Sequence, residues 1–244
     1  MLPTYDEALN VEAIGTAILE RLPGATLLIV DDASPDGTGA IADRMAASDP
    51  SVRTLHRPAK DGLGPAYLAG FAEALNGGAA RVAQMDADWS HDPAYLPDLL
   101  GALERADLVI GSRYTRGGGV RDWSRLRQLV SRGGSLFARI VLRLGPSDLT
   151  GGFKAWRAET LAALPRDGMH AGGYVFQIET TFLADSAGAR IVEIPIVFTD
   201  RLHGVSKMNK GIVREAFFYV LRLRWDELRG RGPLAHPSAA APPR

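Results

Sequence analysis

Two apolar runs that end in acidic residues place the strongest constraint on what this chain can fold into. The first is Thr26-Leu27-Leu28-Ile29-Val30-Asp31-Asp32, and the second begins at Arg81 and breaks into Asp86-Ala87-Asp88. Continuous apolar runs of this length are typical of strands buried in parallel sheets. In open α/β folds, ligands bind at the carboxyl ends of such strands. The two runs therefore predict a parallel sheet with acidic groups at its ligand-binding edge.

Helical and extended patterns alternate through the first 110 residues. Apolar spacing predicts helices over about 10–22, 39–47, 60–75 and 94–104, and strands over 26–32, 52–56, 80–85 and 108–110. This alternation predicts a doubly wound, mostly parallel α/β sheet. The segment Leu2-Pro3-Thr4-Tyr5-Asp6-Glu7 leaves no room for a strand before a loop, so we expect part of a first strand to be missing.

Asp86 and Asp88 have the spacing of a metal-binding pair. Side chains at i and i+2 of an extended segment share a face, so both carboxylates can reach one hard cation such as Mg²⁺ or Mn²⁺. Such an ion takes further ligands from phosphates, which favours a diphosphate substrate. The alternative is ordinary helix-start chemistry, with Asp92 as the cap and Pro93 as the first helical residue. The residues alone leave both interpretations open.

Composition narrows the possible chemistry. The 244 residues contain no Cys and only 5 His, which excludes disulfides, thiolate zinc sites and Cys nucleophiles and agrees with a cytosolic protein. Residues 1–110 carry 7 basic and 17 acidic side chains, whereas residues 111–145 carry 8 Arg and a single acid, Asp122. This asymmetry favours two different ligands, the second of them anionic. We find no signal peptide and no apolar run of the ~18 residues typical of a transmembrane helix.

The second half contains two amphipathic helical patterns rich in Arg, over about 124–144 and 212–228. Each has two interpretations: a helix at a membrane surface with its apolar face toward acyl chains, or a helix packed on the sheet with a solvated Arg face. Between the two patterns we expect a flexible loop at 117–119, a helix over 174–187 and a strand over 191–198. The Pro-rich tail from Gly230 is predicted to be disordered.

Seven motifs, in order, carry a resemblance to one family. They are Leu2-Pro3-Thr4-Tyr5-Asp6-Glu7, Val30-Asp31-Asp32-Ala33-Ser34-Pro35-Asp36-Gly37-Thr38, Gly62-Leu63-Gly64, Asp86-Ala87-Asp88, Gly111-Ser112-Arg113-Tyr114, Gly151-Gly152-Phe153 and Arg201-Leu202-His203-Gly204-Val205-Ser206-Lys207. Together they resemble the polyprenol (dolichol) phosphate mannosyltransferases, which are inverting family 2 enzymes of the GT-A fold. The match runs from Leu2 to about Trp225. It implies one domain over 1–229, with a donor and metal half (1–112) and an acceptor and membrane-interface half (113–229), followed by the tail at 230–244.

The resemblance also implies roles for individual residues. Those matching donor-binding positions are Pro3, Tyr5, Glu7, Val30, Asp32, Asp86, Ala87, Asp88, Arg201 and Lys207. The metal ligands would be Asp86, Asp88 and Ser90, where Ser90 stands at a position often occupied by Gln in the family. Arg113, Arg127 and Ser131 match acceptor-phosphate positions, and Asp88, Arg113, Arg201 and Lys207 would be catalytic.

The implied reaction moves mannose from GDP-mannose to a polyprenyl monophosphate, with Mg²⁺ or Mn²⁺, on the cytoplasmic face of a membrane. The acceptor is already anionic, so no strong general base is required. A peripheral enzyme acting alone and one paired with a separate membrane-anchoring protein both remain open. The alternatives are a related transferase with a UDP-sugar donor and a noncatalytic lipid-phosphate or nucleotide binding module. Nucleic-acid binding is not expected, because no stacking aromatics follow the basic residues in a recognisable module.

Overall fold

The computed structural model describes residues 1–165, 169, 173–200 and 210–230. Its strands form two main groups. The first contains β1 (Leu2–Thr4), β2 (Leu27–Asp31) and β3 (Val52–His56), all parallel. The second has the order β4 (Arg81–Gln84), β7 (Lys154–Arg157), β5 (Leu108–Ser112) and β8 (Ile191–Pro195). The carboxyl ends of β2 and β4 carry the predicted acidic residues.

Met1 joins the two groups into one sheet. Its amino group donates to Ala83 O at 2.8 Å, and Met85 N donates to Met1 O at 3.4 Å, which is the hydrogen-bond pattern of a parallel pair. The strand order is therefore β3-β2-β1-β4-β7-β5-β8, and it reverses direction between β1 and β4. Such a reversal is the topological switch point at which α/β proteins bind ligands.

The predicted doubly wound, mostly parallel sheet is confirmed, with three corrections. We expected no room for a strand before the first loop, and this is wrong, because three residues suffice for β1 when both of its neighbours supply backbone partners. The antiparallel strand β7 was not predicted. The strand expected over 191–198 is divided at Ile196 into β8 and β9 (Val197–Phe198). Strand β9 pairs with β6 (Gly119–Val120), which begins at the last residue of the expected flexible loop.

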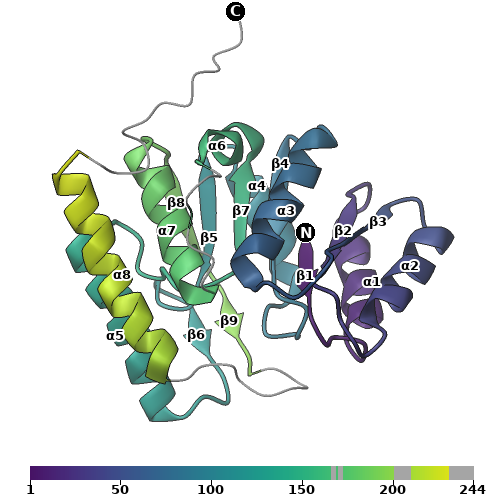
Figure 1. The fold of residues 1–244 in the computed structure, drawn as a ribbon, viewed down its shortest axis with the longest axis horizontal. Coiled ribbons are helices and arrows are strands. Elements are labelled where there is room, and N and C mark those ends of the chain that lie inside the picture. The colour runs from purple at the N-terminus through teal and green to yellow at the C-terminus, as the bar shows by residue number, and fades with distance from the viewer. Residues whose placement is uncertain (166–168, 170–172, 201–209, 231–244) are drawn as a thin grey trace, which may run out of the picture.

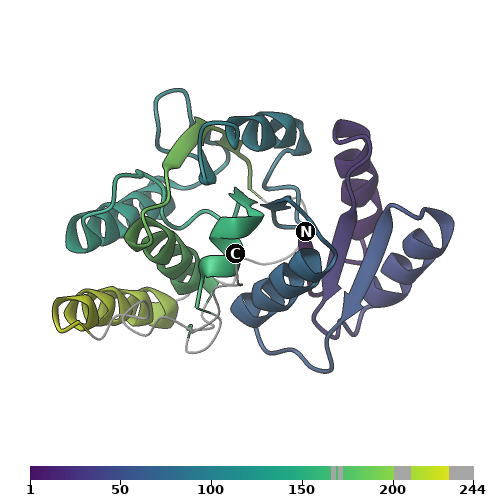
Figure 2. The same ribbon diagram turned by 90° about the horizontal axis from the view of Figure 1, so that it is seen from above.

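Helices cover both faces of the sheet. On one face α1 (Val11–Arg21) packs against α2 (Thr38–Ser48) and α4 (Leu96–Ala102), which follows the 3-10 turn η1 (Pro93–Tyr95). On the other face α3 (Leu63–Asn76) packs against α6 (Ala158–Ala163) and α7 (Gly173–Ser186), as Figure 2 shows. The largest core cluster lies under α1 and α4, and the second lies under α3, α6 and α7.

Two long helices, α5 (Arg125–Leu142) and α8 (Lys210–Leu228), lie side by side at one end of the sheet (Figure 1). They meet through stacked rings of Phe137 and Phe217, whose centroids are 4.6 Å apart. Ten of the twelve large apolar side chains that are exposed in the described residues belong to these helices: Leu126, Leu129, Val130, Leu136, Ile140, Phe217, Phe218, Leu221, Trp225 and Leu228. Both helices therefore expose much of their apolar surface, while Leu142 of α5 and Val220 and Leu223 of α8 are buried in a core cluster that includes residues of α7.

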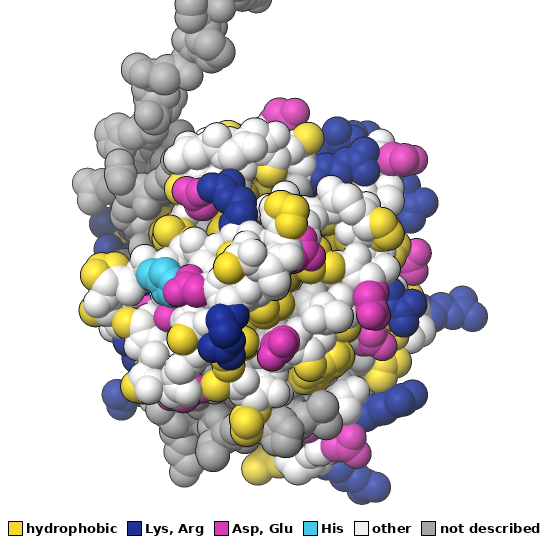
Figure 3. Space-filling model, turned by 90° about the vertical axis from the view of Figure 1, so that its right-hand side faces the viewer, with side chains coloured by type: hydrophobic (Ala, Val, Ile, Leu, Met, Phe, Trp, Pro, Cys, Tyr) yellow, Lys and Arg dark blue, Asp and Glu magenta, His cyan; other side chains and the backbone are white. Residues whose placement is uncertain are grey.

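The opposite side of the molecule differs. Around α1, α2 and β3 the surface mixes acidic, basic and apolar side chains without a continuous apolar area (Figure 3). In the described part of the chain, no helix is both long and apolar enough to cross a membrane.

Candidate active site

Three strained loops mark the switch point. The chain beyond β1, β2 and β4 passes through Asp6 (φ 60°), Ala33 (φ 57°) and Trp89 (φ 62°), all non-glycine residues with left-handed backbone. This conformation is unfavourable for residues with a Cβ and persists where the surroundings fix it, often at binding sites. Because β1 lies between β2 and β4, the three loops meet at one edge of the sheet.

The acid pair follows β4 at this edge. Asp88 is 5% exposed, and its Oδ1 accepts hydrogen bonds from Ser90 Oγ at 2.5 Å and Ser90 N at 3.1 Å. The side chain of Asp86 is more open, at 34% exposed, and its Oδ1 accepts from the Tyr67 hydroxyl at 3.2 Å. Ser90 thus orients one carboxylate and Tyr67 the other.

Both carboxylates act on the same two buried rings. Burial raises the pKa of Tyr67, and the negative charges of Asp86 and Asp88 raise it further. Burial lowers the pKa of His91 against the opposing effect of the same two charges, and His91 Nδ1 accepts a hydrogen bond from Asp86 N at 3.2 Å. The two carboxylates therefore influence the protonation of the same two buried rings.

The oxygen atoms of Asp86, Asp88 and Ser90 are suitable ligands for a hard divalent cation. Two carboxylates and a hydroxyl are oxygen ligands of the kind Mg²⁺ and Mn²⁺ prefer, and such ions complete their shells with water and phosphate. Among the described residues there is no cluster of three or more acidic or His side chains with metal-binding geometry. The alternative helix-start role belongs to Asp92, whose Oδ1 accepts from Ala94 N at 2.8 Å ahead of Pro93.

Gly152 explains part of the Gly-Gly-Phe motif. A Cβ at this position would lie 3.3 Å from Asp86 Oδ1 and 3.3 Å from the Tyr67 hydroxyl. Its carbonyl oxygen accepts from Gln84 Nε2 at 3.0 Å, which ties the 151–153 segment to the end of β4. The motif therefore packs directly against the acid pair.

The predicted donor residues of the first two strands lie together. Pro3 and Val30 are register partners in the β1–β2 pair, and Val30 is fully buried beside Ala66. Asp32 forms an ion pair with Arg57, and its Oδ2 accepts from the backbone of Asp61 at 3.3 Å and Gly62 at 3.2 Å. In this structure Asp32 thus fixes the 57–62 loop beside the edge of the sheet.

Tyr5 and Glu7 lie on the loop after β1. Lys60 Nζ is 3.5 Å from the centroid of the Tyr5 ring, which brings the 57–62 loop over the end of β1. Glu7 N donates to Thr38 Oγ1 at 2.9 Å, and the Glu7 carboxylate accepts from Asn10 Nδ2 at 2.8 Å. Ala87, the other predicted donor contact, is buried in the largest core cluster.

Arg113, at the end of β5, has a buried counter-ion. Its Nε and Nη2 donate to the two oxygens of Asp148, each at 2.7 Å, and Nη2 also donates to Thr150 Oγ1 at 2.8 Å. Arg113 is 4% exposed and Asp148 is fully buried. Burial raises the pKa of Asp148, but the charge and hydrogen bonds of Arg113 outweigh that effect and hold this pKa below its usual value.

The other two predicted acceptor residues adjoin Arg113 through aromatic rings. Tyr114 donates its hydroxyl hydrogen to Ser131 Oγ at 2.6 Å. The Trp123 ring lies 5.5 Å from the Arg113 guanidinium and 4.1 Å from that of Arg127. The structure therefore brings Arg113, Arg127 and Ser131 into one cluster around Tyr114 and Trp123.

Arg127 is bound more loosely than Arg113. Its Nη1 donates to Asp200 Oδ2 at 2.8 Å, with the two side chains 20% and 35% exposed. Arg127 Nε and Trp123 Nε1 are buried donors without a hydrogen-bond partner in the described residues. Such donors are uncommon in folded proteins and point to an acceptor from a ligand or from water.

The predicted Arg201 and Lys207 lie outside the described residues, as does the tail beyond Gly230. The sequence-based reasoning also missed several residues that support the site: Arg57, Tyr67, His91, Trp123 and Asp148. The local sequence carries no signal for Asp148, because its partner lies 35 residues away. His91 directly follows the Asp86–Ser90 segment, so its position was the one available hint.

A doubly wound sheet with a carboxylate pair at its switch point agrees with a glycosyltransferase of the GT-A fold, the class to which the sequence comparisons assign the chain. The sequence model described as Glycosyl transferase family 2 matches residues 1–164. The chain belongs to glycosyl transferase family 2. Two curated relatives confirm its resemblance to the polyprenol phosphate mannosyltransferases.

Two relatives cover nearly the whole chain. An undecaprenyl-phosphate mannosyltransferase of Micrococcus luteus is 48% identical over 95% of this chain and 97% of the relative. A polyprenol monophosphomannose synthase of Mycolicibacterium smegmatis is 44% identical over 94% of this chain and 89% of the relative.

Solved structures share the fold at lower identity. Glucosyl-3-phosphoglycerate synthase from Mycobacterium tuberculosis in complex with phosphoglyceric acid superposes with a TM-score of 0.64 at 21% identity, covering 91% of this chain and 78% of that one. Its complex with Mn²⁺, UDP-glucose and phosphoglyceric acid gives a TM-score of 0.64 at 23% identity, covering 91% of this chain and 77% of that one.

Proposed function

We propose that this protein transfers mannose from GDP-mannose to a polyprenyl monophosphate, with inversion at the anomeric carbon. The observation that carries the proposal is the cluster of Arg113, Arg127 and Ser131 beside α5, a helix whose apolar face is exposed. A lipid phosphate needs both features, an anion site for its head and an apolar surface for its chain. Two relatives named for polyprenyl-phosphate mannosylation, each more than 40% identical, support this acceptor and this sugar.

The acceptor phosphate would bind at the Arg127 end of the cluster. Arg127 Nε and Trp123 Nε1 are donors without a partner in the described residues, and Arg127 is the more exposed of the two cluster arginines. Arginine donors suit a phosphate because they give forked, charge-assisted hydrogen bonds. Ser131, one turn further along α5, adds a hydroxyl.

The donor would bind across the ends of β1, β2 and β4. The nucleotide would contact Pro3, Tyr5, Glu7, Val30 and Asp32. The departing diphosphate is predicted to be held by Arg201 and Lys207. Asp86, Asp88 and Ser90 would hold Mg²⁺ or Mn²⁺, which when bound offsets negative charge on the diphosphate. The Mn²⁺ and UDP-glucose complex of a protein with the same fold supports a divalent ion in this role.

The chemistry is a direct displacement. An oxygen of the acceptor phosphate forms a bond to the anomeric carbon as the bond from that carbon to the donor diphosphate breaks, and GDP leaves. The attacking oxygen is already anionic, so no group must remove a proton. Catalysis then depends on orienting the two substrates and on stabilising the charge that develops on the diphosphate.

The exposed apolar faces of α5 and α8 would contact the membrane that holds the acceptor. The exposed Arg132, Arg139 and Arg143 alternate with these apolar residues along α5 and its end, as in helices that lie in a headgroup layer. The protein would then be peripheral on the cytoplasmic face, alone or with a separate membrane-anchoring protein. We expect Leu129→Asp combined with Phe218→Asp to abolish cosedimentation with vesicles containing anionic lipid. Leu9→Asp, an exposed Leu near α1, serves as the matched control.

The experiment that tests the function is transfer of radiolabelled sugar to a polyprenyl monophosphate, with GDP-mannose and UDP-glucose in parallel and with Mg²⁺, Mn²⁺ or chelator. We expect metal-dependent label in the lipid fraction from GDP-mannose alone. Label from UDP-glucose alone would assign the protein to the alternative UDP-dependent class. Asp88→Ala should abolish transfer without unfolding the chain, whereas Asp98→Ala on the surface of α4 should retain it.

A further inference from the structure

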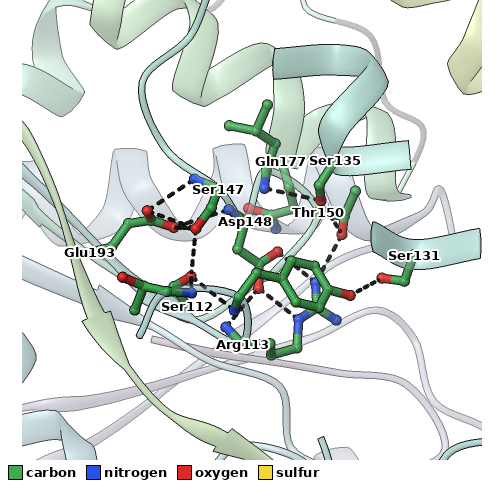
Figure 4. Close-up of polar contacts among 12 residues, drawn as sticks. Ser112, Arg113, Ser131, Ser135, Ser147, Asp148, Thr150, Gln177 and Glu193 are labelled. Atoms are coloured by element: carbon green, nitrogen blue, oxygen red, sulfur yellow. Dashed lines mark hydrogen bonds and ion pairs between the residues drawn. The ribbon is translucent and has the colours of Figure 1, made fainter. Parts of the chain in front are cut away.

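A continuous polar network runs from β8 to the proposed acceptor site (Figure 4). It begins at Glu193, in the middle of β8, where Glu193 is the register partner of Ile110 in β5. It passes through Ser147 and Asp148 in the loop before β7 and reaches Arg113 at the end of β5. None of the proposed substrate contacts includes Glu193.

Glu193 directs its carboxylate to two successive residues of this loop. Its Oε2 accepts from Ser147 N at 2.9 Å, and its Oε1 accepts from Asp148 N at 3.0 Å. The hydroxyl of Ser147 donates to the same carboxylate, at 2.8 and 2.9 Å to the two oxygens. Three donors on two neighbouring residues leave the 147–148 backbone little freedom to rotate.

The loop in turn contacts Arg113 through Asp148. Asp148 accepts from Arg113 N at 3.0 Å as well as from Nε and Nη2, so it holds both the backbone and the guanidinium of this residue. The same guanidinium donates to Thr150 Oγ1, which is 3.4 Å from Ser135 Oγ on α5. A shift of the loop would therefore move Arg113 relative to α5, the helix that carries Arg127 and Ser131.

A strand pair does not by itself require an acid at position 193. The β5–β8 ladder is formed by backbone groups, and an apolar side chain would satisfy it equally well. A half-buried carboxylate with three charge-assisted hydrogen bonds to one loop is a specific arrangement, because such bonds are about twice as strong as neutral ones.

We propose that Glu193 is a positioning residue for the acceptor phosphate, acting through Ser147 and Asp148 on Arg113. This rests on the proposed function, in which the cluster of Arg113, Arg127 and Ser131 binds that phosphate. In the described residues the Glu193 side chain hydrogen-bonds to Ser147 and Asp148 and to none of the residues proposed to bind the donor, so its effect should fall on the acceptor and not on the nucleotide sugar.

The test is steady-state transfer by Glu193→Gln, with the acceptor and the donor varied separately. Gln keeps the size of the side chain but turns an amide NH₂ toward donors that need an acceptor. We expect KM for the polyprenyl phosphate to rise about tenfold, the scale of losing a hydrogen bond to a charged group. KM for GDP-mannose should change less than about twofold. Glu159→Gln, an exposed Glu of α6, is the matched control and should match the wild type in both values.

A second variant keeps the test valid if Glu193→Gln does not fold. Ser147→Ala removes one hydroxyl but retains Glu193 and both backbone donors, so it should raise KM for the acceptor in the same direction by a smaller factor. A lowered melting temperature with both KM values unchanged, or an equal rise in both, would overturn the positioning role.

Direct binding separates this proposal from the proposed function. Calorimetric titration of the wild type with geranyl monophosphate should show binding that Glu193→Gln weakens. Absence of binding to the wild type would contradict the acceptor assignment itself. Equal binding by the wild type and Glu193→Gln would contradict only the role of Glu193.

Discussion

Two Arg–Asp pairs flank the proposed acceptor site, and they differ in burial and in the number of contacts. Arg113 and Asp148 are 4% and 0% exposed and share three hydrogen bonds, including one from the Arg113 backbone. Arg127 and Asp200 are 20% and 35% exposed, and Arg127 Nη1 donates to Asp200 Oδ2 at 2.8 Å. The first pair is part of the protein interior, and the second lies at its surface.

The difference separates two tasks that an arginine can perform beside a phosphate. A buried Arg with a bidentate carboxylate cannot exchange its partner without leaving a charge uncompensated. A partly exposed Arg can exchange one anion for another at small cost, because water screens the charges during the change. We therefore expect Arg113 to hold the shape of the cluster and Arg127 to exchange Asp200 for the acceptor phosphate.

The largest effect is expected from Asp148→Ala. Removing one member of a buried pair leaves the Arg113 charge without its counter-ion, which should lower the free energy of unfolding by about 3–5 kcal/mol. Urea denaturation would measure this change. Asp200→Ala provides the comparison and should cost less than about 1 kcal/mol. Equal losses in the two variants would remove the distinction between the pairs.

The sequence predicted the framework of this arrangement but not its contacts. Hydrophobic runs located β2 and β4 and their acidic ends, because a buried strand must be apolar along its length. Periodicity also identified α5 and α8 as amphipathic, but it does not determine whether an apolar face meets the core or the solvent. That direction depends on neighbours that are distant in sequence, such as Ile178 and Phe182 of α7, which occupy the core cluster shared with α5 and α8.

Strand β7 shows why other parts were missed. It contains Lys154 and Arg157, charged residues that are unusual in a central strand, and it reads locally as a polar segment. Lys154 is tolerated because α7 supplies its acceptors: the Gln177 carbonyl at 2.7 Å and Thr181 Oγ1 at 2.9 Å. The same limit applies to Asp148, since a single acid between a Ser and a Leu does not identify a partner 35 residues away.

Lys154 is a buried basic residue like Arg113, but its amine donates to the Gln177 carbonyl and the Thr181 hydroxyl instead of to a carboxylate. Burial lowers its pKa from the usual 10.5 to about 7, with the charge of Asp148 acting in the opposite direction. Above about pH 7 the folded chain therefore holds a neutral amine, while the unfolded chain keeps its proton until about pH 10.5. The unfolded state binds more protons in this window, so stability should rise with pH across it.

The measurement is the free energy of unfolding in urea near pH 7 and near pH 9, for the wild type and for Lys154→Met. The wild type should gain about 2 kcal/mol relative to the variant between these values. Lys60→Met, on the surface beside Tyr5, is a control for loss of a lysine and should follow the wild type. A constant difference between wild type and Lys154→Met would mean that the amine keeps its charge inside the protein.

The smallest expected effect comes from Asp200→Asn, which changes only the exposed pair of Arg127 and Asp200. Asp200→Asn removes the anion that Arg127 contacts, so an incoming phosphate no longer competes with a carboxylate. We expect KM for the polyprenyl phosphate to fall by about two- to fivefold, the equivalent of a partly exposed ion pair, while KM for GDP-mannose stays unchanged. The gain should shrink as salt is raised, because exposed charges are screened.

Asp226→Asn is the matched control for this prediction. Asp226 lies on α8, is 34% exposed and faces Arg222 at 3.5 Å, so it reproduces the exposure and the charge change of Asp200 away from Arg127. A gain in both variants would mean that the acceptor responds to the overall charge of this face. A rise in acceptor KM for Asp200→Asn alone would mean that Asp200 holds Arg127 in place for the phosphate, and the two pairs would then perform the same task.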